Sequence, residues 1–194
     1  RGDGANRERI PPGQFVTPDF PVLTAGPTQH IATDRWSLSV LHGDTALGAW
    51  SWEQFAALPQ TEISADIHCV TKWTKFDTRW RGVTIDDLLR AAGAEVPPTR
   101  FLMAHCDGGY TTNLRLADLL DAKAMVATHF DGVPITASHG GPARLLVPHL
   151  YFWKSAKWVR QLVFRDDETP GFWEALGYHI RGDPWQEQRY EGDR

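Results

Sequence analysis

The chain has 194 residues, about the length of one domain, and its 42% hydrophobic and 23% charged residues are typical of a folded globular protein. Its formal net charge of −4 argues against nucleic-acid binding, which requires a basic surface. No run of about eighteen apolar residues occurs, so we predict no membrane span. The length of the chain leads us to predict a single domain over residues 1–194.

The sequence contains only two cysteines, Cys69 and Cys106. They are too few for a disulfide framework and lack the paired spacing of a zinc site, although a bond between the two stays open. Such a small number of thiols is typical of proteins in a reducing compartment, and we therefore expect a cytoplasmic protein. The sequence begins at Arg1 rather than Met, which leaves open a removed upstream signal and a periplasmic location.

The first half of the chain is predicted to form short strands and helices behind an extended arm. The arm covers residues 1–33, where five prolines and several apolar residues indicate an irregular segment that packs on the domain. A strand follows at 35–42, and Ser51 opens a short helix with a capping-box pattern. Apolar and polar residues then alternate from Thr61 to Cys69, which predicts a strand whose last inward-facing residue is Cys69.

The second half continues with a polar loop after Cys69 and a helix capped by Thr84. Asp131-Gly132 is a strong hairpin signal. The remaining predictions are strands at 100–105, 124–130, 143–147 and 158–164, a short helix at 114–120, and a polar C-terminal tail at 166–194. Short strands and short helices in mixed order predict an α+β fold with mixed β-sheets rather than a doubly wound fold.

Cys69 is the first residue that suggests chemistry. A thiol at a strand end, followed by Lys72 and Lys75, lies where positive charge stabilises a thiolate. The residues alone leave three alternatives: a thiolate stabilised by positive charge, a buried structural cysteine, or the nucleophile of a cysteine hydrolase. In the last case the base would be one of the histidines His68, His105 and His139.

A second group of polar residues lies around glycine bends between positions 139 and 157. It combines an imidazole, a guanidinium, two ammonium groups and a hydroxyl, from His139, Arg144, Lys154, Ser155 and Lys157. This mixture suits an anion such as a phosphate, while an ordinary solvated turn is the alternative. Tyr110 follows two glycines, where its phenol is either a hydrogen-bond donor in a pocket or simply packed.

Several segments, in this order along nearly the whole chain, resemble the sulfite-oxidase-like molybdopterin oxidoreductases, and especially their stand-alone bacterial branch. The most specific are Asp66-Ile67-His68-Cys69 and His139-Gly140-Gly141-Pro142-Ala143-Arg144. The other matching segments are 10–14, 17–23, 70–73, 80–83, 108–114 and 145–158. The resemblance implies the sulfite-oxidase-type molybdopterin-binding fold.

The resemblance also implies roles for particular residues. Cys69 would be the thiolate ligand of molybdenum, and Tyr110 the active-site tyrosine near the metal. The pterin and its terminal phosphate would lie on His139, Arg144, Ser155 and Lys157. Further neighbours of the cofactor would be Thr17, Asp19, His68, Lys72 and Trp73. The implied cofactor is molybdenum with molybdopterin in its mononucleotide-free form, and Cys106 is left without a partner.

Two departures from the family pattern bear on the substrate. Sulfite oxidases place one arginine five residues after the ligand cysteine and another in the N-terminal arm, where this chain has Thr74 and Thr17. We therefore expect two-electron oxygen-atom transfer on a small oxo-anion, sulfoxide or related molecule other than sulfite. The haem domain and the dimerisation domain of animal enzymes have no counterpart in this sequence, so a separate haem-, flavin- or quinone-linked redox partner is expected.

Two alternatives to this enzyme stay open. A protein with the same residues could bind or store the cofactor without turnover, and a cysteine hydrolase would hold no metal. Reduction of an oxo-acceptor by an artificial electron donor would separate an enzyme from a storage module.

Overall fold

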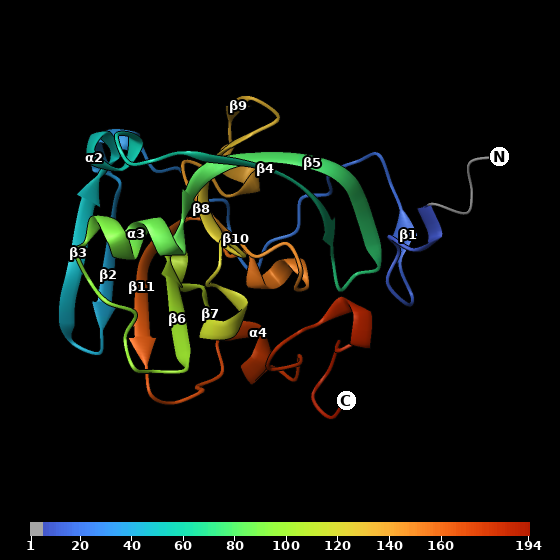
Figure 1. The fold of residues 1–194 in the computed structure, drawn as a ribbon. Coiled ribbons are helices and arrows are strands. Elements are labelled where there is room, and N and C mark those ends of the chain that lie inside the picture. The colour runs from blue at the N-terminus through green and yellow to red at the C-terminus, as the bar shows by residue number, and fades with distance from the viewer. Residues whose placement is uncertain (1–5) are drawn as a thin grey trace.

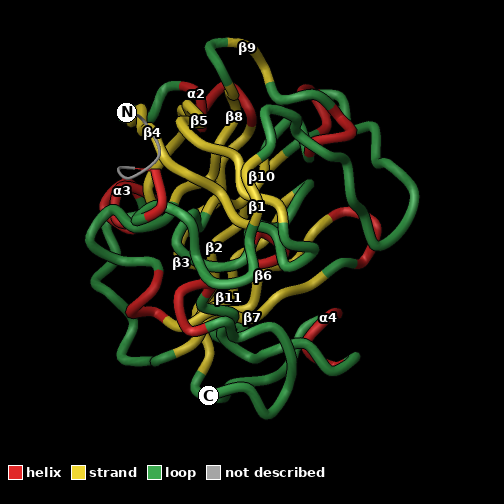
Figure 2. The backbone as a smooth tube through the Cα atoms, turned by 90° about the vertical axis from the view of Figure 1, so that its right-hand side faces the viewer, coloured by secondary structure: helices red, strands yellow, loops and turns green. Residues whose placement is uncertain are grey.

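The computed structural model describes residues 6–194, so the first five residues of the predicted arm lie outside the described part (Figure 1). The predicted α+β class with mixed sheets is confirmed: two sheets carry most of the regular structure, and the helices are short (Figure 2). None of the helices among residues 6–194 is long and apolar enough to span a membrane.

One sheet has five strands in the order β3-β2-β11-β6-β7. Its members are β2 (Ser37–His42), β3 (Thr45–Ser51), β6 (Phe101–Cys106), β7 (Thr111–Arg115) and β11 (Val159–Arg165). The pairing of β11 with β2 is parallel and the other pairings are antiparallel, so the sheet is mixed. It brings the strand before Tyr110 beside the strand that follows Lys157.

The second sheet has six strands built on the order β1-β5-β8-β10, with β4 on β5 and β9 on β8. Its members are β1 (Phe15–Val16), β4 (Thr61–His68), β5 (Trp73–Thr84), β8 (Met125–Phe130), β9 (Val133–Pro134) and β10 (Arg144–Leu146). Two residues of the arm, Phe15 and Val16, pair in parallel with Trp73 and Thr74 and so attach the arm to this sheet.

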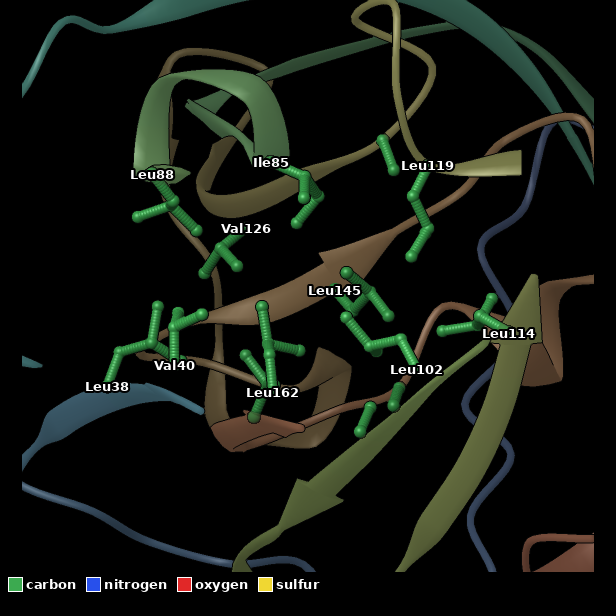
Figure 3. Close-up of a cluster of buried hydrophobic side chains, with 14 of the residues drawn as sticks. Leu38, Val40, Ile85, Leu88, Leu102, Leu114, Leu119, Val126, Leu145 and Leu162 are labelled. Carbon is green, nitrogen blue, oxygen red and sulfur yellow. The ribbon is translucent and has the colours of Figure 1, made fainter. Parts of the chain in front are cut away.

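The main hydrophobic core lies between the sheets and α3 (Ile85–Ala91) (Figure 3). Val40 and Leu162 from the five-stranded sheet converge with Val126 from the other sheet and Leu88 from the helix, and all are at most 2% exposed. Fully burying each such side chain stabilises the fold by about 1.5–3 kcal/mol. Both sheets are thereby fixed in one rigid scaffold.

Local signals predict several elements correctly. Ser51 and Gln54 form both hydrogen bonds of the capping box that begins α2 (Trp52–Ala56). Asp131 and Gly132 adopt positive φ angles in the turn between β8 and β9. The strand predicted from Thr61 is β4, which ends one residue before Cys69.

Three predictions differ from the structure. The polar loop predicted after Cys69 is a four-residue turn followed by β5, in which charged residues such as Arg79 and Arg81 are exposed while Thr78 and Trp80 are buried. The helix predicted at 114–120 is replaced by the end of β7 and one 3₁₀ turn, Leu116–Asp118. The strand β3 was not predicted. In these cases pairing with a neighbouring strand outweighs local composition: β3 pairs with β2, β5 with β4, and β7 with β6.

The C-terminal segment folds back under the domain in short pieces, among them α4 (Phe172–Ala175) and a 3₁₀ turn at Pro184–Gln186. Figure 1 shows this segment in red, close to the end of the β4–β5 hairpin and to the blue N-terminal arm. Both ends of the described chain therefore lie near the turn that follows β4.

Candidate active site

A cavity of about 360 Å³ lies next to Cys69, between the turn after β4 and the segment after β10. Five stretches of chain form its walls: 20–29 of the arm, 69–73, 107–110, 139–158 and 172–178. Of the predicted site residues it brings together Cys69, Trp73, Tyr110, His139, Arg144, Ser155 and Lys157. Residues as far apart in the sequence as Phe20 and Tyr178 thus share one pocket of a size typical for small-molecule ligands.

Cys69 is buried, with 7% of its surface exposed, and its Sγ accepts a hydrogen bond of 3.0 Å from the Thr71 hydroxyl. Burial raises the pKa of the thiol above its usual value, and hydrogen bonds from Thr71 and Val70, followed by the charge of Arg189, only partly oppose this. Within residues 6–194, no histidine donates to or accepts from this sulfur, and neither cysteine forms a disulfide. A protonated thiol without a base does not support the cysteine-hydrolase alternative.

Arg144 is a buried cation without a counter-ion. Its guanidinium is 1% exposed and donates only to the backbone oxygens of His139 and Ser155, and it lies 4.2 Å from the ring centre of Phe152. Burial lowers its pKa to about 9, because no carboxylate among the described residues pairs with it. Such a charge is costly unless a ligand compensates it.

Lys157 adds a second positive charge to this wall. Its Nζ donates to the backbone oxygens of Ser138 and Leu23, both at 2.7 Å. Burial, and then the charge of Arg144, lowers its pKa to about 8. The Ser155 hydroxyl instead accepts from the Val147 amide at 2.8 Å, so its oxygen also supports the local backbone.

Four buried polar atoms on the cavity walls have no hydrogen-bond partner: Nε1 of Trp73, Nε1 of Trp153, Nε of Arg144 and Nδ1 of His139. Three of these are obligatory donors. Buried donors are nearly always paired in native proteins, so their concentration here indicates a ligand rich in acceptor atoms. Trp153 was not among the predicted residues.

The His139 ring packs against Phe20 of the arm, with ring centres 3.9 Å apart and ring planes tilted by 39°. Its pKa is lowered to about 4 by burial and then by the charges of Arg144 and Lys157. The loop that carries it is tightly fitted, because a Cβ added to Gly141 would lie 1.9 Å from the Ile135 oxygen. Only glycine fits this position, and the fit holds the imidazole against the cavity.

Tyr110 lies on the opposite wall, and its hydroxyl donates to the Trp153 oxygen at 2.7 Å. Burial raises the pKa of its phenol well above 10, and the nearby Glu174 adds to this. The side chain is therefore a neutral donor throughout the physiological range.

Four predicted site residues do not line the cavity. Lys72 is exposed and adopts a positive φ of 83° in the turn after Cys69. His68 faces the other side of β4, where its Nδ1 lies 2.8 Å from the Thr74 hydroxyl. Thr17 accepts a hydrogen bond from the backbone amide of Asp19, and both lie on the outer part of the arm. Strand alternation explains His68, because neighbouring residues point to opposite faces.

A family model, the oxidoreductase molybdopterin binding domain, matches residues 25–173. The chain belongs to this family of molybdopterin-binding oxidoreductases. This confirms the predicted class of enzyme. The chain is 43% identical over 186 residues to the "uncharacterized oxidoreductase YuiH" of Bacillus subtilis, and the match covers 95% of this chain and 93% of that protein.

Two further relatives of this oxidoreductase are larger proteins. It is 28% identical to the "putative protein-methionine-sulfoxide reductase subunit YedZ1" of Azospira oryzae, over 69% of this chain and 50% of that protein. It is 24% identical to the mitochondrial sulfite oxidase of Drosophila melanogaster, over 85% of this chain and 34% of that one. The chain thus spans half or less of these two relatives.

The fold of the oxidoreductase resembles the sulfane dehydrogenase SoxCD of Paracoccus pantotrophus, with a TM-score of 0.63 and 21% identity over 72% of this chain and 40% of that one. This likeness confirms the predicted fold of the sulfite-oxidase type. Among residues 6–194, no group of three or more histidine, cysteine or acidic side chains could hold a metal. The cavity fits molybdopterin nonetheless: one soft sulfur suits the metal, and cations and unpaired donors suit an anionic, acceptor-rich ligand.

Proposed function

We propose that this oxidoreductase binds molybdenum with molybdopterin in the cavity beside Cys69 and catalyses two-electron oxygen-atom transfer. The single observation that supports this most strongly is the presence of the Cys69 sulfur, an uncompensated Arg144 and four unpaired polar atoms on the walls of one cavity. Cys69 is the one protein ligand to the metal in this proposal. The cofactor is the form without a nucleotide.

The anionic part of the cofactor lies against Arg144 and Lys157. Their charges favour a phosphate group, and an anion there would compensate the buried guanidinium. The unpaired Nε of Arg144 and Nδ1 of His139 supply directed hydrogen bonds to the same ligand. The indole donors of Trp73 and Trp153 remain for acceptor atoms elsewhere on the ligand.

When bound, molybdenum supplies the two-electron redox chemistry, and the protein supplies binding, orientation and exclusion of water. Aromatic side chains close the cavity on the side of the C-terminal segment, where Phe172, Trp173 and Tyr178 line it. Tyr110 keeps its phenolic proton and is placed to donate a hydrogen bond to a reacting oxygen. To donate there, the Tyr110 hydroxyl must give up its hydrogen bond to the Trp153 oxygen.

The substrate class we propose is a small oxo-anion, sulfoxide or related oxo-acceptor. Thr17 and Thr74 stand where sulfite oxidases have arginines, and neither lines the cavity. A relative is named as a reductase of protein methionine sulfoxide, which agrees with a sulfoxide. That relative is also named as a subunit, in keeping with a separate redox partner that is haem-, flavin- or quinone-linked. Two unbridged cysteines suit the cytoplasm as the compartment.

The test is metal analysis of the purified protein together with two matched cysteine variants. Wild type and Cys106→Ser should both contain about one molybdenum per chain, since only Cys69 faces the cavity. In Cys69→Ser, X-ray absorption at the molybdenum edge should show one sulfur ligand fewer, and turnover should vanish. Absence of molybdenum from wild type, or an unchanged sulfur count in Cys69→Ser, would contradict the proposal. Bound molybdenum without reduction of any oxo-acceptor would indicate a storage protein.

A further inference from the structure

The turn after β4 (residues 69–72) and Trp73, the first residue of β5, are held by a side chain from the N-terminal arm. The Gln14 amide nitrogen Nε2 donates to the Cys69 oxygen at 3.0 Å and to the Trp73 oxygen at 2.9 Å. The Cys69 oxygen also accepts from the Lys72 amide at 2.9 Å. Both hydrogens of one side-chain amide are thus used on the backbone around Cys69.

The same turn is held from the other end of the chain by Arg189. Its Nη1 donates to the Val70 oxygen at 2.6 Å, one residue after Cys69. The guanidinium is 7% exposed, and its central carbon lies 5.1 Å from the centre of the Tyr151 ring. A buried guanidinium bound to a backbone oxygen holds that oxygen more firmly than a neutral donor does.

Gln14 and Arg189 are joined to each other. Arg189 Nη2 donates to Gln14 Oε1 at 2.7 Å and to the Pro12 oxygen at 3.1 Å. The approach is close enough to require glycine at position 13, where φ is +74° and an added Cβ would lie 2.8 Å from Arg189 Nη2. The arm, the tail and the turn therefore form one hydrogen-bonded unit, which we call the Gln14–Arg189 clamp. Figure 1 shows the three segments together at the right of the molecule.

The two residues that name the clamp, Gln14 and Arg189, lie outside the part of the chain that matches the family model, which covers residues 25–173. It acts on a strained turn, because Lys72 adopts a positive φ of 83° that non-glycine residues rarely adopt. Such a conformation persists when the surrounding structure fixes it. The carbonyl oxygens of Cys69, Val70 and Trp73 are the atoms that the clamp holds.

We propose that Gln14 and Arg189 are positioning residues that fix the direction of the Cys69 sulfur into the cavity. The inference rests on the proposed function, in which that sulfur binds molybdenum. Groups behind a metal ligand orient it and thereby tune the metal, so a loosened turn would give a spread of metal–sulfur geometries. The clamp also makes the sulfur less accessible when no metal is bound.

The first experiment measures how fast a thiol reagent modifies Cys69 in cofactor-free protein, with the modified peptide identified by mass spectrometry. Gln14→Met and Arg189→Met should each raise the rate about tenfold, because the turn opens more often without these hydrogen bonds. Arg9→Met is the matched control: Arg9 ties the same arm to Asp66 and does not touch the turn, so the rate should stay within about twofold of wild type.

The second experiment records the electron paramagnetic resonance spectrum of the partly reduced molybdenum-loaded protein. Wild type and Arg9→Met should give one sharp signal, and the clamp variants a broadened or split signal from several sulfur orientations. Gln14→Glu keeps an acceptor for Arg189 but replaces the amide donor by a carboxylate oxygen that repels the Cys69 and Trp73 oxygens, so it tests the release of the turn even if Arg189→Met does not fold.

Two results would overturn the clamp: an unchanged thiol rate and spectrum in Gln14→Glu and Gln14→Met, or an equal effect of Arg9→Met. The proposed function fails separately, if wild type holds no molybdenum. In that case a faster thiol reaction in the clamp variants would still show that Gln14 and Arg189 fix the Cys69 turn.

Discussion

Lys154 and Glu174 form an ion pair that is closed to solvent: Nζ lies 2.8 Å from Oε1, and each side chain is 1% exposed. Lys154 also donates to the backbone oxygens of Asn113 and Ile180, and Glu174 accepts from the Thr112 hydroxyl. The pair thereby joins the aromatic wall of the cavity at 172–178 to β7 and to the segment after β10.

Removing one member of this pair should destabilise the protein strongly. We expect Lys154→Met to lower the free energy of unfolding by about 3–5 kcal/mol, because it leaves the Glu174 carboxylate buried and uncompensated. The double variant Lys154→Met/Glu174→Gln should recover part of the loss. Urea unfolding of cofactor-free protein measures both.

The exposed pair Arg165–Asp167 provides the control. Asp167→Asn should change stability by less than about 1 kcal/mol, since exposed ion pairs contribute little. If Lys154→Met lowers the free energy of unfolding no more than Asp167→Asn does, the buried pair does not stabilise the fold.

Local patterns predicted the elements whose causes are local. The capping box at Ser51, the hairpin at Asp131-Gly132 and the alternation before Cys69 depend on residues within a few positions of one another. Strand β5 was not predicted, since its polar stretch is organised by pairing with β4 and with β8, and β8 is distant in the sequence.

The candidate site shows the same limit. Resemblance to a family brought Cys69, His139, Arg144 and Lys157 together, whereas their spacing alone did not, and the cavity that they share depends on the whole fold. Arg189 could not be found from local pattern, because its partner Gln14 is 175 positions away. Contacts of this kind follow from tertiary structure and leave no periodic signal.

Cofactor retention should depend on the two cations of the cavity. Arg144→Met and Lys157→Met should each weaken retention by about tenfold or more, because each removes a charge-assisted hydrogen bond to an anion. Molybdenum and pterin content per chain, measured after extensive dialysis, reports the effect. Lys123→Met removes a lysine that bonds only to the Ala117 oxygen and should retain the wild-type content. Equal content in all four proteins would contradict an anion site at Arg144 and Lys157.

The stability of the cofactor-free protein should depend on His139 in mild acid. Its pKa is about 4 in the folded protein and near 6.5 when unfolded, so between these values the unfolded chain binds the additional proton. Above pH 6.5 the imidazole is neutral in both states and costs no stability. The free energy of unfolding therefore falls as the pH is lowered from 6.5 towards 4.

His139→Gln should therefore flatten the decline of stability over this interval, by an amount on the order of 1–2 kcal/mol after allowance for the partly exposed ring. Chemical denaturation at a series of pH values measures this, and an NMR titration of the imidazole gives the pKa directly. A pKa of His139 near 6.5 in cofactor-free protein would refute the prediction.

Tyr110→Phe should separate the catalytic role of the phenol from its structural one. If the hydroxyl donates to the reacting oxygen, its loss should lower kcat about 10–100-fold with little change in KM, since the interaction is made mainly in the transition state. The folded protein should lose only about 1 kcal/mol, the value of the single hydrogen bond to the Trp153 oxygen. Steady-state reduction of a sulfoxide by an artificial electron donor gives kcat and KM.

Because the phenol keeps its proton far above neutral pH, the wild-type rate should show no loss from this group up to pH 10. An unchanged kcat in Tyr110→Phe would show that the tyrosine only holds the wall at Trp153.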